Sequence, residues 1–414
     1  MKEEIIASLE NPKKLEELYR NNKGTFKRSF DLVYPDISGS LTAQIWNERL
    51  NFENKEISWG TKKELIVILA LSVIAGLVAK IPDFAALNQE FFYLRNIAFV
   101  FLPMLMLYFA WKQSMPAAKL LIISGVIAVS ALYINLLPLN EKSDTLLLAC
   151  IHLPLFMWAL WGYTFTGNQF KIFQKRTEFL CFNGELVVMT TVMLIAGAIL
   201  SAVTIGLFEL INLKIEEFYF RNIAVWGLAA SPILGTYIVL SNPQLVKNVS
   251  PVIAKVFTPL VLVMLVVYLI AIVYTGKDPY NDREFLLIFN LLLVGVMAII
   301  LFSVAETSKS GGNKSGTLLL FMLSIVTIIV NGIALSAIVF RIAEWGITPN
   351  RLAVLGGNVL ILINLMMVTY RIFKSLKSAN ELVSVENSIA SFLPVYTVWT
   401  LIVTFVFPVL FGFK

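Results

Sequence analysis

Charged residues are scarce in this sequence, and so are the residues that build most catalytic and metal centres. Only 14% of its 414 residues are charged, against roughly 25% in an ordinary soluble domain. It has one histidine and two cysteines, Cys150 and Cys181, which fall near opposite ends of a predicted helix, too far apart to form a disulfide. These absences argue against a soluble domain, and we predict no metal site and no cofactor.

Familiar enzyme motifs are missing as well. The sequence has no HExxH, GxSxG or CxxC, and "SGGNKSG" at Ser310–Gly316 lacks the spacing of a phosphate-binding P-loop. Carboxylates that could work as a catalytic pair are confined to the predicted loops. We therefore name no catalytic residue and lean against an enzyme, while a membrane-embedded enzyme stays open.

Long apolar runs are what the sequence has instead. Hydrophobic residues make up 58% of the chain, and runs of about 20 residues, the length of a membrane-spanning helix, recur from Leu65 almost to the end. The runs lack the polar/apolar alternation of barrel strands, so helices must satisfy the backbone. We predict an all-α fold, a polytopic transmembrane helical bundle of about eleven helices. The predicted spans are 65–81, 91–111, 119–138, 146–166, 186–208, 221–241, 253–275, 285–305, 317–340, 352–373 and 389–411.

The positive charge is spread over short loops between the predicted helices. A net charge of +6 would suit a nucleic-acid partner, but in a membrane protein such charge orients the helices. We predict membrane lipids as partners and no nucleic-acid binding. Lys and Arg concentrate in alternate loops, and the positive-inside rule makes these loops cytoplasmic. The N-terminus is then cytoplasmic and the C-terminus lies outside.

Residues 1–63 precede the first predicted span and carry helix signals of their own. Asn11-Pro12 is typical of a helix start, and Phe26, Phe30 and Tyr34 recur at helical spacing. We predict a small helical cytoplasmic region whose aromatic stripe packs against the membrane helices. Its basic residues either meet anionic lipid or, interleaved with acidic ones, form a solvated face. A cytoplasmic protein partner for residues 1–63 is an alternative role.

An internal repeat runs through the membrane part. "EFFYLRNIAF" at Glu90–Phe99 matches "EFYFRNIAVW" at Glu217–Trp226, and the preceding segments Lys63–Gly76 and Gly184–Gly197 match as well. Matching helices have the same predicted orientation, so we predict parallel four-helix repeats, with a partial third copy at the end. The predicted parts are 1–63, the repeats 64–183 and 184–306, and a three-helix part 307–414.

The repeat places Arg95 and Arg221 at equivalent helix starts on the predicted outer side. One interpretation is a repeated interfacial anchor, since a guanidinium at a helix end can extend to the lipid headgroups. The other is that both arginines converge on an outward-facing cavity that binds an anionic group.

Polar side chains within the apolar runs are site candidates, because burying them in hydrocarbon is costly unless they are paired or face a cavity. Amides more often form hydrogen bonds between helices, and a lone histidine is more often a packed neutral imidazole than a proton relay. These intramembrane polar residues are Asn290, Asn331, Asn358, Asn364 and His152.

The stretch "RIAEWGITPNRLAVL" at Arg341–Leu355 resembles a motif of a bacterial polytopic membrane family known as domain of unknown function 4153. "LEELYRNNKGTFKRSF" and "WNERLNFENKEISWG", near the N-terminus, resemble its members from Bacteroidota-like bacteria. The resemblance implies a multi-pass inner-membrane protein with about this number of helices, and it supplies no activity. The motif residues are Arg341, Glu344, Gly346, Thr348, Asn350 and Arg351.

Part of this motif has a local structural explanation. Thr348 can cap a helix that begins with Pro349. The remaining charged residues, Arg341, Glu344 and Arg351, fall on the same predicted outer face as the two repeat arginines. Together with Asn350 they are our candidate ligand-binding residues. The sequence thus favours a transporter-like or lipid-handling protein with an outward-facing, arginine-lined cavity, and the alternative is a membrane sensor or scaffold that signals through its N-terminal region.

Overall fold

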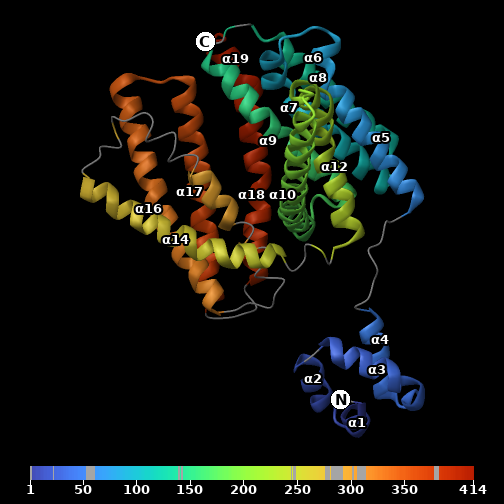
Figure 1. Cartoon of the computed structure of the whole chain (residues 1–414). Helices are drawn as coiled ribbons and strands as arrows, with labels where there is room; N and C mark the ends of the chain where they lie inside the picture. The colour runs from blue at the N-terminus through green and yellow to red at the C-terminus, as the bar shows by residue number, and fades with distance from the viewer. Residues whose placement is uncertain are drawn as a thin grey trace. The chain divides into compact units, whose positions relative to one another are not determined.

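The computed structural model describes residues 2–21, 23–52, 61–138, 140, 143–243, 245, 249–275, 280, 292–300, 303–304, 314–376 and 382–414. All regular secondary structure in these ranges is helical, which confirms the predicted all-α polytopic fold. The chain forms two compact units, Met1–Gly60 and Thr61–Lys414 (Figure 1). Each unit is described by itself below.

The N-terminal unit is a small helical domain with its own apolar core. Phe26 and Phe30 are fully buried, and the ring of Phe26 contacts those of Tyr19 and Trp46. We expected this aromatic stripe to pack against the membrane helices, but it packs inside its own unit, because these short helices can bury their rings against one another. The helices are α1 (Lys2–Ala7), α2 (Pro12–Asn21), α3 (Lys23–Ile37) and α4 (Leu41–Phe52).

The membrane unit contains eight described helices long and apolar enough to cross a bilayer, and the protein is a multi-pass membrane protein. Its elements are α5 (Lys62–Ala79), α6 (Ile81–Phe84), α7 (Gln89–Lys112), α8 (Ala117–Leu136), α9 (Asp144–Thr166), α10 (Phe173–Leu210), α11 (Glu216–Tyr219), the π-helix η2 (Phe220–Ala224), α12 (Val225–Ser241), α14 (Val249–Thr275), α16 (Lys314–Trp345), α17 (Pro349–Ser375), α18 (Leu382–Leu401), the π-helix η4 (Ile402–Val406) and α19 (Phe407–Leu410).

Each of the other predicted spans also contains helix. The span 65–81 corresponds to α5, which begins with the charged residues Lys62, Lys63 and Glu64. The span 253–275 lies in α14, whose apolar part is Val256–Ala271. Of the span 285–305, the described segment 292–300 is helical.

Local signals set many helix ends. The side chains of Asn88 and Ser143 cap α7 and α9, and Thr348 accepts a hydrogen bond from the Arg351 backbone N–H at the start of α17. The predicted Thr348 cap is thereby confirmed. Short turns join α7 to α8 and α16 to α17, and α6, α19 and the C-terminus lie on one side of the membrane unit, while α14 lies across the direction of α17 and α18 (Figure 1).

Two helix pairs are held at close range by a glycine facing a tryptophan. A Cβ added to Gly76 of α5 would lie 2.1 Å from the Trp226 ring of α12, and one added to Gly356 of α17 would lie 2.1 Å from the Trp399 ring of α18. In the matching repeat segment, Gly197 has no such neighbour within 4 Å. The predicted boundary at residue 183 falls inside the continuous helix α10. The repeat itself stays a prediction.

Prolines inside helices leave carbonyl groups without their usual partner, because proline has no N–H to donate. Pro394 in α18 deprives the carbonyl of Ala390, and the Arg176 guanidinium, from the first turn of α10, donates to that oxygen at 3.0 Å. In α12, Pro232 deprives Leu228, whose carbonyl accepts a hydrogen bond from the Ser231 hydroxyl. Side chains thus replace the missing backbone donors, as lipid cannot.

The pairing of Arg176 with Pro394 predicts a measurable coupling. Arg176→Met should lower the free energy of unfolding by about 1–3 kcal/mol, because it leaves a buried carbonyl without a donor. In a Pro394→Ala background the backbone N–H of residue 394 returns, and the loss from Arg176→Met should shrink. A double-mutant cycle in thermal unfolding of the purified protein measures this coupling. Equal losses in both backgrounds would contradict the assignment.

Candidate functional site

Arg95 is buried inside the membrane unit. It is 1% exposed, although it carries a full positive charge in an apolar helix. Its guanidinium donates to the carbonyl oxygens of Ile134 at 2.7 Å and Leu137 at 2.9 Å, at the end of α8, and lies 4.4 Å from the centre of the Phe91 ring. Pro138 stands four residues after Ile134 and cannot donate to it. Arg95 therefore caps a helix end that proline leaves open.

The asparagine that follows supports the same junction. Asn96 and Asn135 exchange two amide hydrogen bonds, at 2.9 Å and 2.7 Å, between α7 and the last turn of α8. Arg95 and Asn96 thus join α7 to the C-terminal end of α8. These contacts give the pair a structural role that fits neither a headgroup anchor nor an exposed cavity wall.

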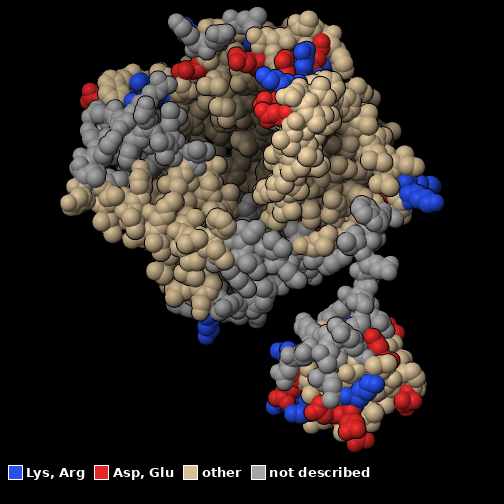
Figure 2. All heavy atoms as spheres, in the orientation of Figure 1, with Lys and Arg blue, Asp and Glu red and all other residues tan. Residues whose placement is uncertain are grey.

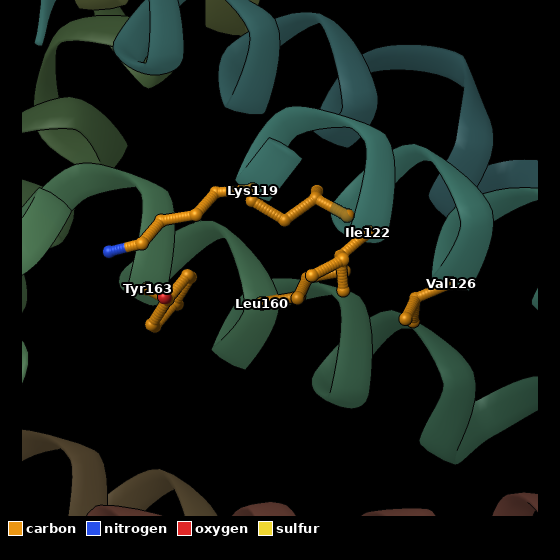
Figure 3. A pocket seen from close by; sticks show the side chains of 6 residues that line it. Lys119, Ile122, Val126, Leu160 and Tyr163 are labelled. Atoms are coloured by element: carbon orange, nitrogen blue, oxygen red, sulfur yellow. The ribbon is translucent and has the colours of Figure 1, made fainter. Parts of the chain in front are cut away.

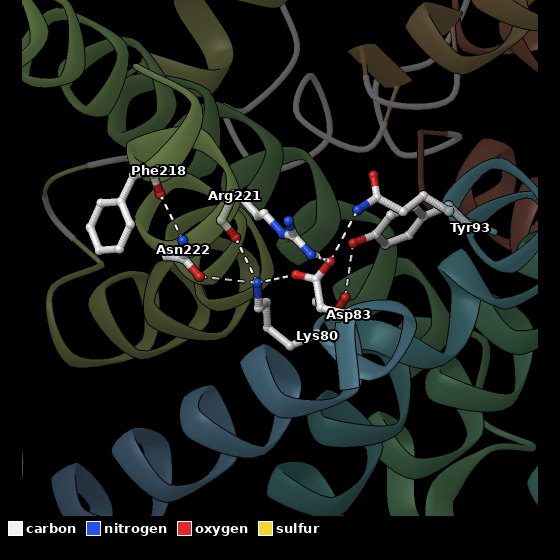
Figure 4. Close-up of polar contacts among 8 residues, drawn as sticks. Lys80, Asp83, Tyr93, Phe218, Arg221 and Asn222 are labelled. Carbon is white, nitrogen blue, oxygen red and sulfur yellow. Dashed lines mark hydrogen bonds and ion pairs between the residues drawn. The ribbon is translucent and has the colours of Figure 1, made fainter. Parts of the chain in front are cut away.

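Arg221 has different surroundings. It lies in the π-helix η2, and its side chain is 55% exposed. Its guanidinium pairs with the Asp83 carboxylate at 3.1 Å (Figure 4). Asp83 also forms an ion pair with Lys80, and it accepts a hydrogen bond from the Gln89 amide at 3.2 Å.

Lys80 is the buried centre of this cluster. It is 6% exposed, and besides Asp83 its ammonium donates to the backbone oxygen of Arg221 at 2.9 Å and to the Asn222 amide oxygen at 3.3 Å. Figure 4 shows how the ends of α5, α6 and η2 converge on its nitrogen. Two cations share one carboxylate, so the cluster formed by Lys80, Asp83 and Arg221 carries a net positive charge.

The charge of Asp83 holds this cluster together. Hydrogen bonds from Lys80 and Arg221 lower the pKa of the Asp83 carboxyl below its usual value. The folded state therefore favours the ionised form, and the resulting stabilisation is present above the ordinary pKa of an aspartate, about 4. It is lost as the pH falls through the lowered folded-state pKa.

A pH series tests this assignment. We expect the difference in thermal stability between wild type and Asp83→Asn to be constant from about pH 5 to 8, and to diminish below about pH 4 as the wild-type carboxyl is protonated. Thermal unfolding in nanodiscs at each pH measures it. A difference that grows on acidification would contradict the pairing.

The late sequence motif forms the turn between α16 and α17. Gly346 adopts a φ of +76°, a conformation that glycine tolerates after a helix end. The Arg351 guanidinium donates to the backbone oxygens of Trp345 at 2.8 Å and Gly346 at 2.7 Å. Trp345 ends α16, so its carbonyl has no donor from a following helical turn, and Arg351 supplies one.

The other members of the motif lie around the same turn. The Arg341 guanidinium lies 5.1 Å from the centre of the Trp345 ring. Glu344 is exposed in the last turn of α16, and Asn350 is half-buried in the first turn of α17. Arg95, by contrast, binds the end of α8, and Arg221 binds Asp83. The candidate residues thus occupy three separate structural settings.

Two of the intramembrane polar side chains link neighbouring helices. The Asn331 amide donates to the Asn358 backbone oxygen at 3.2 Å, joining α16 to α17, and the Asn364 amide donates to the Tyr396 hydroxyl at 3.0 Å, joining α17 to α18. The His152 imidazole contacts the Leu148 carbonyl within α9 at 2.9 Å. Asn290 lies outside the described residues.

Sequence reasoning missed the partners in the Lys80–Asp83–Arg221 cluster. Lys80 lies at the end of the predicted span 65–81, where a lysine can extend to the lipid headgroups. One local signal was present, since Asp83 follows it at the i,i+3 spacing at which helical side chains meet. Arg221 reaches Asp83 only because η2 lies close to α6 in the folded structure. No local sequence pattern predicts this contact between distant segments.

Comparisons with known proteins add no relative to this description. No protein-family model matches the sequence, and no curated protein or solved structure matches it either. Among the described residues, no group of histidine, cysteine, aspartate and glutamate side chains could hold a metal ion. The Lys80–Asp83–Arg221 cluster, with two cations and one carboxylate, is a candidate for binding an anion.

Proposed function

We propose that this is a lipid-handling protein of the bacterial inner membrane, which holds a membrane amphiphile beside α10 and contacts its anionic headgroup through Arg221. The observation that carries this proposal is a hollow in the membrane unit, beside the column formed by α10 (Figure 2). The distribution of basic loops supports a cytoplasmic N-terminus and an outer C-terminus.

The outer half of α10 is an unusual surface for a helix within a bundle. No residue from 191 to 210 is buried, and exposed apolar side chains point in all directions around the axis. Ile195, Ile199 and Leu200 are each more than half exposed. A helix of this kind presents hydrocarbon surface toward the hollow as well as toward the bilayer.

Such a hollow is suited to acyl chains. Water needs two or more polar partners to occupy a cavity, and this surface of α10 offers mainly apolar side chains. In a bilayer the available apolar molecule is lipid. The rim carries charge, because acidic and basic side chains gather on the side where α6 and the C-terminus lie (Figure 2).

Arg221 provides a suitable contact for a phosphate. It follows the end of α10 closely in sequence, and its guanidinium is half exposed while Asp83 holds one edge of it. A guanidinium can bind a carboxylate and a phosphate together, since it has five donors in a planar arrangement. The buried Lys80 keeps the cluster positive.

Reconstitution tests the proposal. Full-length protein in liposomes should accelerate the transbilayer movement of a fluorescent phosphatidylglycerol, measured by dithionite quenching. Arg221→Gln should slow this movement by about fivefold, the effect of one lysine or arginine charge at a membrane surface. The matched control is Lys63→Gln, which removes an exposed charge at the start of α5.

Two outcomes would refute the proposal. One is a rate equal to that of empty liposomes. The other is an equal loss in the Arg221→Gln and Lys63→Gln variants, which would indicate general surface charge. Protein-dependent release of an entrapped solute without lipid movement would favour a solute transporter instead.

A second candidate function rests on the N-terminal unit. It has an apolar core of its own and an ion pair between Arg49 and Glu16 at 2.7 Å. A folded unit of this kind could engage a cytoplasmic partner and make the protein a sensor or scaffold. Deletion of residues 1–60 is the test: if the cellular phenotype of the full gene deletion is not reproduced, the sensor hypothesis fails.

A further inference from the structure

A groove of about 260 Å³ lies between α8 and α9, away from the Lys80–Asp83–Arg221 cluster (Figure 3). Its wall is apolar over most of its length, and its one charged residue, Lys119, comes from the first turn of α8. Figure 3 shows the Lys119 ammonium and the Tyr163 ring at one end and Val126 toward the other. The lining residues are Lys119, Ile122, Ile123, Val126, Leu160 and Tyr163.

The groove opens on a lipid-facing surface. Helix α8 is among the least buried of the candidate spans, and its residues Leu121, Ile122 and Val129 are each at least 65% exposed. A groove in such a helix face at bilayer depth is filled by hydrocarbon. Its lining supplies apolar contact along one stretch and polar groups at a single end.

The polar end favours an anionic headgroup. Lysine is a common ligand of phosphate, and the Tyr163 hydroxyl can donate a hydrogen bond to the same group. Helix α8 also begins after Pro116 without a side-chain cap, so the positive end of its dipole adds to the attraction.

We propose that this groove binds an anionic phospholipid of the adjoining leaflet. An acyl chain lies along Ile122, Val126 and Leu160, and the phosphate meets Lys119 and Tyr163. The order of groups along the groove, polar at the helix end and apolar toward the membrane centre, matches the order within a phospholipid. This site does not depend on the function proposed above, because a tightly held lipid would be present whatever the protein transports or senses.

Photolabelling can test the site in the full-length protein. The protein is placed in nanodiscs with phosphatidylglycerol or phosphatidylcholine carrying a diazirine on one acyl chain, and the labelled peptides are identified by mass spectrometry. We expect phosphatidylglycerol to label peptides of 117–126 and 158–166 more than phosphatidylcholine does. Lys119→Gln should reduce this labelling about fivefold, and Val126→Trp, which fills the groove, should reduce labelling by both lipids.

Matched controls separate the site from general membrane contact. Lys63→Gln removes an exposed lysine elsewhere, and Leu132→Trp adds a ring to an exposed position of α8 that does not line the groove. Both should leave the labelling unchanged. Equal labelling by the two lipids would overturn the anionic specificity, and labelling that survives Val126→Trp would overturn the groove as its location. An equal loss in Lys63→Gln would mean surface attraction only.

Discussion

Replacing Arg95 by methionine should destabilise the protein far more than the same replacement at Arg221, although the two arginines lie in segments of similar sequence. Arg95 is buried and donates hydrogen bonds to the carbonyls of Ile134 and Leu137. Because these contacts are buried, water cannot replace the lost donor. Leaving the carbonyls unsatisfied should cost about 2–5 kcal/mol. Arg221 is half exposed and pairs with Asp83, so its loss should cost about 0–1 kcal/mol.

Thermal unfolding in nanodiscs, followed by size-exclusion chromatography of the heated samples, compares the two variants under one set of conditions. Arg95→Lys is a useful third variant, because it keeps the charge but loses the planar array of donors that serves several carbonyls. We expect it to be intermediate. Similar losses for Arg95→Met and Arg221→Met would show that the two arginines have the same role, as an anchor or shared-cavity interpretation requires.

Among glycine substitutions in the described helices, Gly356→Leu and Gly76→Leu should be the two most disruptive. Any side chain at Gly356 would overlap the Trp399 ring, because even its Cβ would lie 2.1 Å from ring atoms. The contact between α17 and α18 can accommodate this only by moving the helices apart. We expect a loss of about 1–3 kcal/mol or more.

The adjacent residue provides the control for this experiment. A Cβ at Gly357 has no neighbour within 4 Å, and Gly357→Leu should change stability little. Combining Gly356→Leu with Trp399→Ala removes the overlapping ring and should recover part of the loss, measured in the same thermal assay. Equal effects at Gly356 and Gly357 would indicate that helix propensity, and not the tryptophan contact, determines the result.

Three arginines of the membrane unit have the same kind of hydrogen-bond acceptor, a backbone carbonyl near a proline. Arg95, Arg176 and Arg351 each donate to a carbonyl that stands four residues before a proline. The Ile134 carbonyl is buried and needs a donor from the protein, whereas the Trp345 carbonyl lies at an exposed turn. A guanidinium suits this role because it cannot be deprotonated and its several N–H groups can serve adjacent carbonyls. This explains why so apolar a chain carries arginines at these points.

The helices themselves were predictable from the sequence, because their causes are local. A continuous apolar run of about 20 residues can satisfy its backbone in lipid only as a helix. The start of α17 was also predictable, from Thr348 and Pro349, because a helix cap acts within one turn of its own residue. The helix α10 begins at Phe173, before the predicted apolar span 186–208, because its first turns carry polar and charged residues such as Lys175, Arg176 and Glu178.

The roles of the arginines were decided by the tertiary structure. The segments around Arg95 and Arg221 are nearly the same in sequence, yet one guanidinium caps α8 and the other binds Asp83. Likewise Gly76 faces Trp226, while its repeat partner Gly197 faces open space. By itself the sequence determined that this is a membrane protein built of helices, since hydrophobicity and backbone hydrogen bonding act along the chain. Which charge meets which carbonyl depends on helices distant in sequence, and only their packing fixed it.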